Sequence, residues 1–490
     1  MKLFYNAKFY TMDREGEYYS AVLTQNGIIK DIFNEVPEIP GAEKINLKGA
    51  YVYPGFIDTH THCFEGGLYN LNADLNDARS LKDVFEILSE TKPLNEKIFA
   101  SRFDENKIAE QRFPTAQELD EVFPNNPVFI RRVDGHSCSI NTKAAKELAK
   151  EILLPQNFNG HLSGVANGKA SNWFHRNLSN EVILDAYKNA AEIAVKKGHT
   201  TVHTMIGDAH SDTKHFELIR DNLRKFPINF VLYPQITDVN RALEIGASRV
   251  GGCVLADGSF GSHTAALTSP YSGTKCNFGK LYRSDEEWTK FISDAHNNDL
   301  QAAVHCIGDA AINQILNIYE RVQKENPKDL RHEIIHCELT TDDIIKRMTD
   351  ANVSAVMQPM FDRLWAGKGG LYEQNLGKER TPRTTRLASI YNNDVLLTGG
   401  SDWYITEMDA LAGIDAAVNI HNQKEALTPF QAVEIYTKNA ANLSHNENDF
   451  GRIIKGLNAD FVCLNEDIFS SNDIKNIMIN SVYRKGCKIA

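Results

Sequence analysis

The chain has 490 residues, of which 42% are hydrophobic and 24% charged, a composition typical of globular proteins rather than of disordered, collagen-like or disulfide-scaffolded chains. Lysine and arginine total 53 against 64 aspartate and glutamate residues, and the resulting net charge of −11 disfavours a sequence-independent grip on nucleic acid. The sequence contains no apolar run of about 18 residues, so we expect no helical membrane span.

The eight cysteines are scattered along the chain without a Cys-x-x-Cys pair. The segment from Met1 to Asn6 lacks the apolar core of a secretory signal. We therefore expect reduced thiols in a cytoplasmic protein. The expected partner is a small-molecule substrate, with neither nucleic acid nor membrane. The oligomeric state is open, a homodimer being one alternative.

Both ends of the chain carry short alternating runs of apolar and polar residues, which are typical of strands. In the first segment, 1–53, turn signals occur at Asn26-Gly27 and Pro40-Gly41. The last segment, 451–490, has the same character. We predict that the two segments together build one small β-sandwich.

The middle of the chain, 54–450, alternates compact apolar runs with helical patterns. The apolar runs are 55–61, 200–206, 228–234, 251–257, 301–306, 333–337, 353–358 and 395–399. Such alternation indicates parallel strands buried on both faces. We predict an α/β fold of the (β/α)8 TIM-barrel type, with its chemistry at the carboxyl ends of the strands. The span of about 68–180 is too long for one βα step and predicts an insertion, whose strand at 128–133 lies outside the barrel.

The strongest site signal is the segment from Pro54 to His62, which ends in Asp-Thr-His-Thr-His. Side chains two apart on a strand share one face, with about 6.5 Å between their Cα atoms. His60 and His62 could therefore reach one metal ion. A lone histidine is more often structural, but two with this spacing after an apolar run favour ligation.

Three further apolar runs end in a possible metal ligand: His305, His336 and Asp402. Imidazole and carboxylate groups suit Zn²⁺, and a catalytic zinc keeps one position free for water. Each residue alone could be an ordinary polar group at a strand end. Together they predict a site for one or two divalent ions, with zinc as the expected metal.

The order His-x-His, His, His, Asp at successive strand ends resembles the amidohydrolase superfamily. More narrowly, it resembles the family 3 type, which includes N-substituted formamide deformylases and similar metal-dependent hydrolases. Matching segments run along the chain at 54–62, 131–136 with Asn141, 257–259 with 264–265, 305–309, 358–359, 400–402, 436–437 and 456–461. The resemblance implies a barrel plus a small β-sandwich from both termini, in agreement with the pattern of runs.

One position departs from this family pattern. Binuclear members carry a carboxylated lysine four residues before the Asp-Gly-Ser, where this chain has Cys253. Strand alternation places Cys253 on the same face as Asp257. A thiolate is a good zinc ligand, and members of the D-aminoacylase type are similar in using a cysteine. Cys253 therefore ligates or bridges metal, is an inert thiol beside a one-metal site, or marks a decayed enzyme.

The resemblance and the ligand types predict hydrolysis of a C–N bond in an amide, formamide or cyclic amide. Zinc lowers the pKa of bound water toward about 7, which makes hydroxide available at neutral pH. Asp402 is the candidate general acid/base, which takes the proton of the water and later delivers it to the leaving amine. His136, in the Asp134-Gly135-His136 segment, is a second catalytic candidate that could donate to the substrate carbonyl, or else a surface histidine.

The candidate substrate-binding residues each have a structural alternative. Asp257 and Ser259 contact the substrate or shape their loop. Gln358 meets the substrate or is a structural amide. Trp403 forms part of the pocket wall or only packs against neighbouring side chains.

Two other functions compete with this prediction. Deaminases of the superfamily resemble one another in carrying a glutamate three residues after the fifth-strand histidine, and this chain has Gly308 there. That difference counts against a heterocycle deaminase. A non-catalytic barrel scaffold would need none of the predicted ligands, so their presence opposes that alternative.

Overall fold

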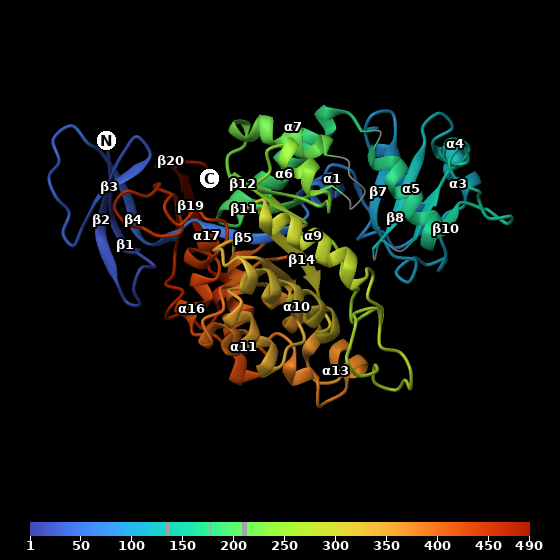
Figure 1. Cartoon of the computed structure of the whole chain (residues 1–490). Helices are drawn as coiled ribbons and strands as arrows, with labels where there is room; N and C mark the ends of the chain where they lie inside the picture. Colours follow the sequence, from blue (N-terminus) through green and yellow to red (C-terminus); the bar gives the residue numbers. More distant parts are fainter. Residues whose placement is uncertain (134, 136, 177, 208–212) are drawn as a thin grey trace. The chain divides into compact units, whose positions relative to one another are not determined.

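The computed structural model describes residues 1–133, 135, 137–176, 178–207 and 213–490. The described chain divides into two compact units, Met1–His62 together with Ala191–Ala490, and Cys63–Ala190 (Figure 1). The insertion expected at about 68–180 lies within the second unit. The domain boundaries at 53 and 450 stay predictions. Within the described ranges, no helix is long and apolar enough to cross a membrane.

Strands from both ends of the chain share one sheet in the first unit. Its order is β20-β19-β18-β4-β1-β2-β3, so the blue N-terminal strands lie beside the red C-terminal ones in Figure 1. The strands are β1 (Lys2–Tyr10), β2 (Tyr18–Gln25), β3 (Ile28–Phe33), β4 (Glu43–Pro54), β18 (Phe461–Leu464), β19 (Ile479–Arg484) and β20 (Cys487–Lys488). The ring of Phe4 packs edge-on against Phe461 and Tyr483, at centroid distances of 5.5 and 5.2 Å. Buried aromatic contacts thus join the two ends, while the sandwich form stays a prediction.

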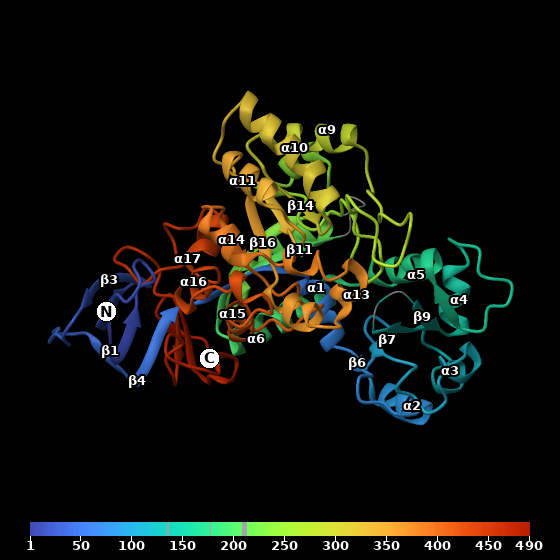
Figure 2. The same ribbon diagram turned by 90° about the horizontal axis from the view of Figure 1, so that it is seen from below.

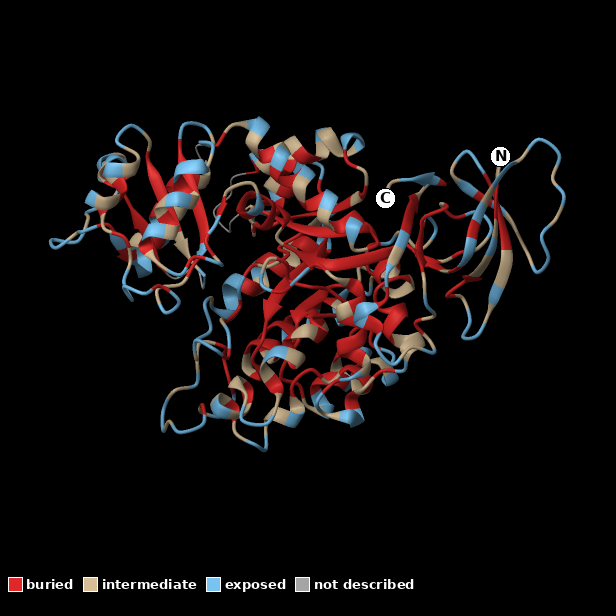
Figure 3. Ribbon diagram, turned by 180° about the vertical axis from the view of Figure 1, so that it is seen from behind, coloured by how far each residue is buried: buried red, intermediate tan, exposed pale blue. Residues whose placement is uncertain are grey.

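The same unit holds two sheets of parallel strands, β12-β11-β5 and β13-β14-β15-β16-β17. These strands are β5 (Phe56–Thr61), β11 (His199–Ile206), β12 (Asn229–Pro234), β13 (Arg249–Val250), β14 (Gln301–Cys306), β15 (Glu333–His336), β16 (Ser354–Met357) and β17 (Leu397–Gly399). Almost all of their residues are buried (Figure 3), as expected for parallel strands covered on both faces.

Hydrogen bonds link the edges of these two parallel sheets. Gly251 N, just after β13, donates to Pro234 O of β12 at 3.1 Å. On the other side, Asp402 N, beyond β17, donates to His60 O of β5 at 2.8 Å. Each sheet therefore contacts the other along both of its edges.

Amphipathic helices cover the outer side of the parallel strands, as α9, α10 and α11 do beside β14 and β16 in Figure 2. Helix α10 shows why: Ile312, Ile315, Leu316 and Tyr319 recur at helical spacing and are all buried. The helices are α7 (Lys214–Asn222), α8 (Val239–Glu244), α9 (Asp285–Asn297), α10 (Asp309–Glu325), α11 (Asp342–Asp350), α12 (Pro359–Phe361), α13 (Leu371–Leu376), α14 (Leu387–Asn392), α15 (Ala410–Val418), α16 (Pro429–Glu434) and α17 (Lys438–Leu443). Helix α6 (Asn180–Lys196) begins in the second unit and ends in the first.

The second unit has a sheet of its own, in the order β10-β9-β8-β7-β6. Its elements are α1 (Cys63–Asn70), β6 (Ala73–Asp74), α2 (Leu81–Glu90), β7 (Ile98–Phe103), α3 (Ala116–Val122), β8 (Val128–Arg132), β9 (Ser137–Ile140), α4 (Thr142–Leu148), β10 (His161–Ser163) and α5 (Gly164–Arg176). The ring of Phe99 stacks on Phe129 and Phe174 at 5.8 and 4.9 Å between centroids. The strand expected at 128–133 is therefore β8 of this sheet rather than a member of the parallel sheets.

Candidate metal centre

Six side chains from five strand ends come together in the first unit. Their ligand atoms form three groups, and within each group these atoms all lie within 4.8 Å of one another. The groups are His60, His62 and Cys253; Cys253, His305 and His336; and His60, His336 and Asp402. All the residues that the sequence suggested as metal ligands are thus brought to one place.

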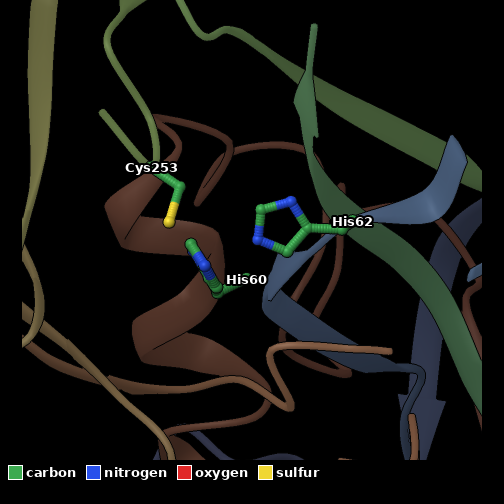
Figure 4. A group of neighbouring side chains, drawn as sticks. All are labelled: His60, His62 and Cys253. Atoms are coloured by element: carbon green, nitrogen blue, oxygen red, sulfur yellow. The ribbon is translucent and has the colours of Figure 1, made fainter. Parts of the chain in front are cut away.

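Cys253 belongs to two of the three groups. In Figure 4 its sulfur points toward the imidazole of His60, with the ring of His62 alongside. On the other side, its Sγ lies 3.7 Å from Nδ1 of His305. The thiol therefore lies between one pair of histidines and the other.

Buried polar atoms in this cluster lack hydrogen-bond partners among the described residues: both ring nitrogens of His60 and Oδ1 of Asp402. Oδ1 of Asp402 lies 3.2 Å from Nε2 of His60 and 3.2 Å from Nε2 of His62. Leaving such buried atoms unpaired is costly. A cation bound between them would satisfy these atoms, so the donor set fits a divalent metal of the zinc type.

The histidines change the ionisation of their neighbours. Burial alone raises the pKa of the Cys253 thiol, but the neighbouring imidazoles of His305, His336, His60 and His62 outweigh it and hold this pKa well below its usual value. Burial opposes charge on His60, but Asp402 and Cys253 raise its pKa to about 9. The cluster thus favours a thiolate, the form in which cysteine binds metal.

The backbone aims His336 and Asp402 by leaving the strand conformation. Ile335 packs in a core cluster with Ala303 and Val356 of the neighbouring strands, so strict alternation would turn His336 to the face opposite to that core. Instead His336 has φ +70°, and Asp402 has φ +54°. These left-handed conformations are uncommon for residues other than glycine and concentrate at functional sites.

Asp58 supports the site, although the sequence analysis did not single it out. Its buried Oδ1 accepts hydrogen bonds from His60 N at 3.1 Å and from Ser401 N at 3.0 Å. The carboxylate therefore ties the strand that carries His60 to the loop that carries Asp402. Its place two residues before His60, on the same face, was the available signal.

Asp257 is fully buried and makes its hydrogen bonds to backbone N–H groups. Oδ1 accepts from Ile307 N at 3.0 Å, and Oδ2 accepts from Gly308 N and Ala266 N, both at 2.8 Å. These three hydrogen bonds fit the loop-shaping alternative for Asp257, while its contact with substrate stays a prediction. Ser259 is exposed and its Oγ lies 2.9 Å from Oγ of Ser262, so its contact with substrate stays a prediction.

The remaining candidates lie in different surroundings. The Oε1 of Gln358 is 2.7 Å from Nδ1 of His336, and the side chain is buried. Trp403 is 7% exposed, and its predicted place in the pocket wall stays a prediction. His136 lies outside the described residues, so its predicted role stays untested.

Gly308 has no space for a side chain. A Cβ atom at this position would lie 1.9 Å from O and 2.6 Å from C of Ala266. The backbone would have to move to admit the glutamate that the deaminase alternative requires.

Comparisons with known proteins identify the family. Residues 43–487 match the family described as "Amidohydrolase family". The chain is 27% identical to "Putative amidohydrolase YtcJ" of Bacillus subtilis over 99% of this chain and 100% of the relative. It is 24% identical to an N-substituted formamide deformylase of Arthrobacter pascens over 98% and 96%. An uncharacterized metal-dependent hydrolase from Pyrococcus furiosus has a similar fold, with a TM-score of 0.84, 24% identity and coverage of 96% and 100%.

The structure is that of an α/β protein with a cluster of possible metal ligands at the ends of its strands. The chain belongs to the amidohydrolase family, because the family match covers most of its length. The resemblance drawn from the motifs is confirmed, and by this membership the chain is a hydrolase.

Proposed function

We propose that this protein is a zinc-dependent hydrolase that cleaves a C–N bond in an amide, formamide or cyclic amide. The observation that carries the proposal is the cluster of histidines, a thiol and a carboxylate, with buried ligand atoms that lack partners among the described residues. The family membership and the name of the formamide-cleaving relative support the choice of bond.

The fold that we propose for this activity is a closed (β/α)8 barrel over 54–450, with a sandwich from 1–53 and 451–490. The hydrogen bonds at both edges of the two parallel sheets support closure. In a closed barrel the carboxyl ends of all strands meet at one mouth, the place where barrel enzymes hold their reactive groups.

Cys253 would hold metal together with both pairs of histidines, His60 with His62 and His305 with His336. Its membership of both groups supports this role over that of an inert thiol. The thiolate favours zinc over harder cations such as Mg²⁺, which prefer oxygen ligands.

A divalent cation held here supplies Lewis-acid chemistry, which lowers the pKa of water and polarises a carbonyl group. The protein supplies the proton transfer. Burial alone raises the pKa of Asp402, but the neighbouring imidazoles of His60, His62 and His336 hold it well below its usual range. The carboxylate is therefore ionised, and we propose that its Oδ1 accepts a proton from the attacking water. The water oxygen bonds to the carbonyl carbon, the C–N bond breaks, and Asp402 returns the proton to the departing nitrogen.

The test begins with metal analysis of the purified protein, followed by a screen of N-formyl, N-acyl and cyclic amides with the zinc-loaded protein. We expect one to two equivalents of transition metal and release of an amine, or ring opening, with at least one class. A stably folded protein that takes up no metal would support the scaffold alternative and end the proposal.

Asp402→Asn tests the proton transfer on whichever substrate the screen finds. We expect loss of most of the turnover, about a hundredfold or more, with folding retained. The matched control is Asp449→Asn, an exposed aspartate on the same chain, which should leave turnover unchanged. Full activity of Asp402→Asn would remove Asp402 from the proton transfer.

A further inference from the structure

We propose that Gln358 is a positioning residue that fixes the protonation and orientation of His336, rather than a residue that contacts the substrate. The proposal rests on the metal centre described above. In this role the amide oxygen of Gln358 accepts a hydrogen bond from Nδ1 of His336. The proton then stays on Nδ1, and Nε2 keeps its lone pair for the cation.

The hydrogen bond between the two side chains carries the argument. Nδ1 of His336 and Oε1 of Gln358 are 2.7 Å apart, and both residues are 2% exposed. The Nε2 of Gln358 donates to Val356 O, at 3.4 Å, in the preceding strand. Because the amide nitrogen is used there, the amide oxygen faces the imidazole. A carbonyl oxygen only accepts, so Nδ1 must carry the proton.

The same turn holds the ring from a second direction. The ring of Phe361 stacks on His336 with 5.8 Å between centroids and 13° between planes. Phe361 N donates to Gln358 O at 2.9 Å, and Pro359 begins the short helix α12 between them. One turn after β16 therefore fixes the imidazole by its edge and by its face.

For His305, a backbone carbonyl oxygen takes the position that the Gln358 side chain has for His336. Its Nε2 lies 3.2 Å from Gly258 O, while its Nδ1 faces the sulfur of Cys253. A main-chain oxygen cannot be removed by mutation. His336 depends instead on a side chain, which makes Gln358 a position where the orientation of a metal-ligand histidine can be tested.

The alternative role, substrate contact, requires a free polar atom that faces the pocket. Both polar atoms of the Gln358 amide already have partners, and the side chain is nearly inaccessible. A histidine ligand typically needs such an outer partner, and loss of the partner lowers metal affinity roughly ten- to a hundredfold.

The experiment compares zinc affinities, measured by competition with a chromophoric chelator on the full-length chain, and needs no substrate. We expect Gln358→Met, which keeps the volume but removes the acceptor, to weaken zinc binding by about ten- to a hundredfold. Gln358→Glu restores an acceptor at the same reach and should bind zinc at least as tightly as the wild type. The control Gln314→Met removes another largely buried glutamine, whose amide donates to Asp285 on the outer helices, and should leave zinc affinity unchanged.

The outcomes separate this inference from the proposed function. A wild-type protein that binds no zinc defeats the proposed function itself. Normal zinc binding by both the wild type and Gln358→Met overturns only the role of Gln358. The role of Gln358 is also overturned if Gln358→Met keeps its zinc affinity but has a raised KM for a substrate found in the screen, because Gln358 would then be a substrate contact. If Gln358→Met does not fold, Gln358→Glu tests the inference instead. Zinc binding by Gln358→Glu that is tenfold weaker than that of the wild type overturns the inference.

Discussion

Replacing Asp257 by alanine should loosen the segment that carries His305, with a cost that can be worked out from three hydrogen bonds. The carboxylate accepts from the backbone N–H groups of Ile307, Gly308 and Ala266 at 3.0, 2.8 and 2.8 Å. A buried donor left without an acceptor costs about 1–3 kcal/mol. Three such donors, partly rescued by water that enters the space, predict a loss of about 3–6 kcal/mol in the free energy of unfolding.

Asp257→Asn refines the estimate. The asparagine oxygen can still serve Ile307, but its amide nitrogen then faces the two N–H groups of Gly308 and Ala266. Two donors lose their acceptor, so we expect a loss of about 2–4 kcal/mol.

Urea unfolding, followed by circular dichroism on metal-free protein, measures these losses, and chelator competition measures zinc affinity. Because Gly258 O also orients His305, both variants should weaken zinc binding as well. The control Asp460→Asn alters a buried carboxylate in the terminal sheet, which accepts from Lys485 N, and should lower stability without changing zinc affinity. An Asp257→Ala protein of nearly wild-type stability but raised KM would refute the reasoning and make Asp257 a substrate contact.

Three further predictions concern metal binding by Cys253, stability at low pH and the substitution of Gly308. Cys253→Ala should bind fewer zinc equivalents than the wild type in metal analysis of the loaded protein; an unchanged stoichiometry would leave the thiol inert. Burial lowers the pKa of His332 to about 3, so the unfolded state binds the extra proton between about pH 6.5 and 3. Stability should therefore fall by up to about 1.4 kcal/mol per pH unit as the pH drops through this range, and His332→Gln should flatten that slope in urea titrations of metal-free protein. Gly308→Ala, which forces a Cβ against Ala266 O, should lower the melting temperature by several degrees or prevent folding, and a wild-type melting temperature would contradict this.

Much of the candidate site could be predicted from the sequence because its ligands lie at the ends of apolar runs. In parallel sheets such ends meet at one edge, so His60, His62 and His305 were expected together before any geometry was known. Cys253 was singled out because it stands where the resembling family has its carboxylated lysine. The strand expected over 251–257 is not formed, because β13 ends at Val250 and Gly251 and Gly252 have positive φ, so alternation from Asp257 does not explain the position of Cys253. The inference on the histidines uses only local periodicity and the order of the strands, whereas that on Cys253 also needed the family resemblance.

The rest depends on contacts between distant segments. Asp58 accepts a hydrogen bond from Ser401 N, which lies more than three hundred residues further along the chain. No local sequence pattern predicts such a bond. His336 was predicted from its place at the end of an apolar run, but its left-handed backbone, with φ +70°, could not be predicted from the sequence. Gln358 was a candidate substrate contact because it ends a strand. Its partner, the imidazole of His336, could not be predicted because helix α11 and strand β16 separate the two residues in the sequence.

The thiol shared by two groups of ligands has a consequence for how the protein would acquire its metal. A lysine in this position must first react with carbon dioxide before it can hold two ions. Cys253 needs only to lose a proton, so zinc loading should be independent of dissolved bicarbonate. The same sulfur can be oxidised by peroxide, which would remove the proposed shared ligand. If Cys253 holds the metal as proposed, zinc loading that does not depend on carbon dioxide would come together with sensitivity toward oxidants.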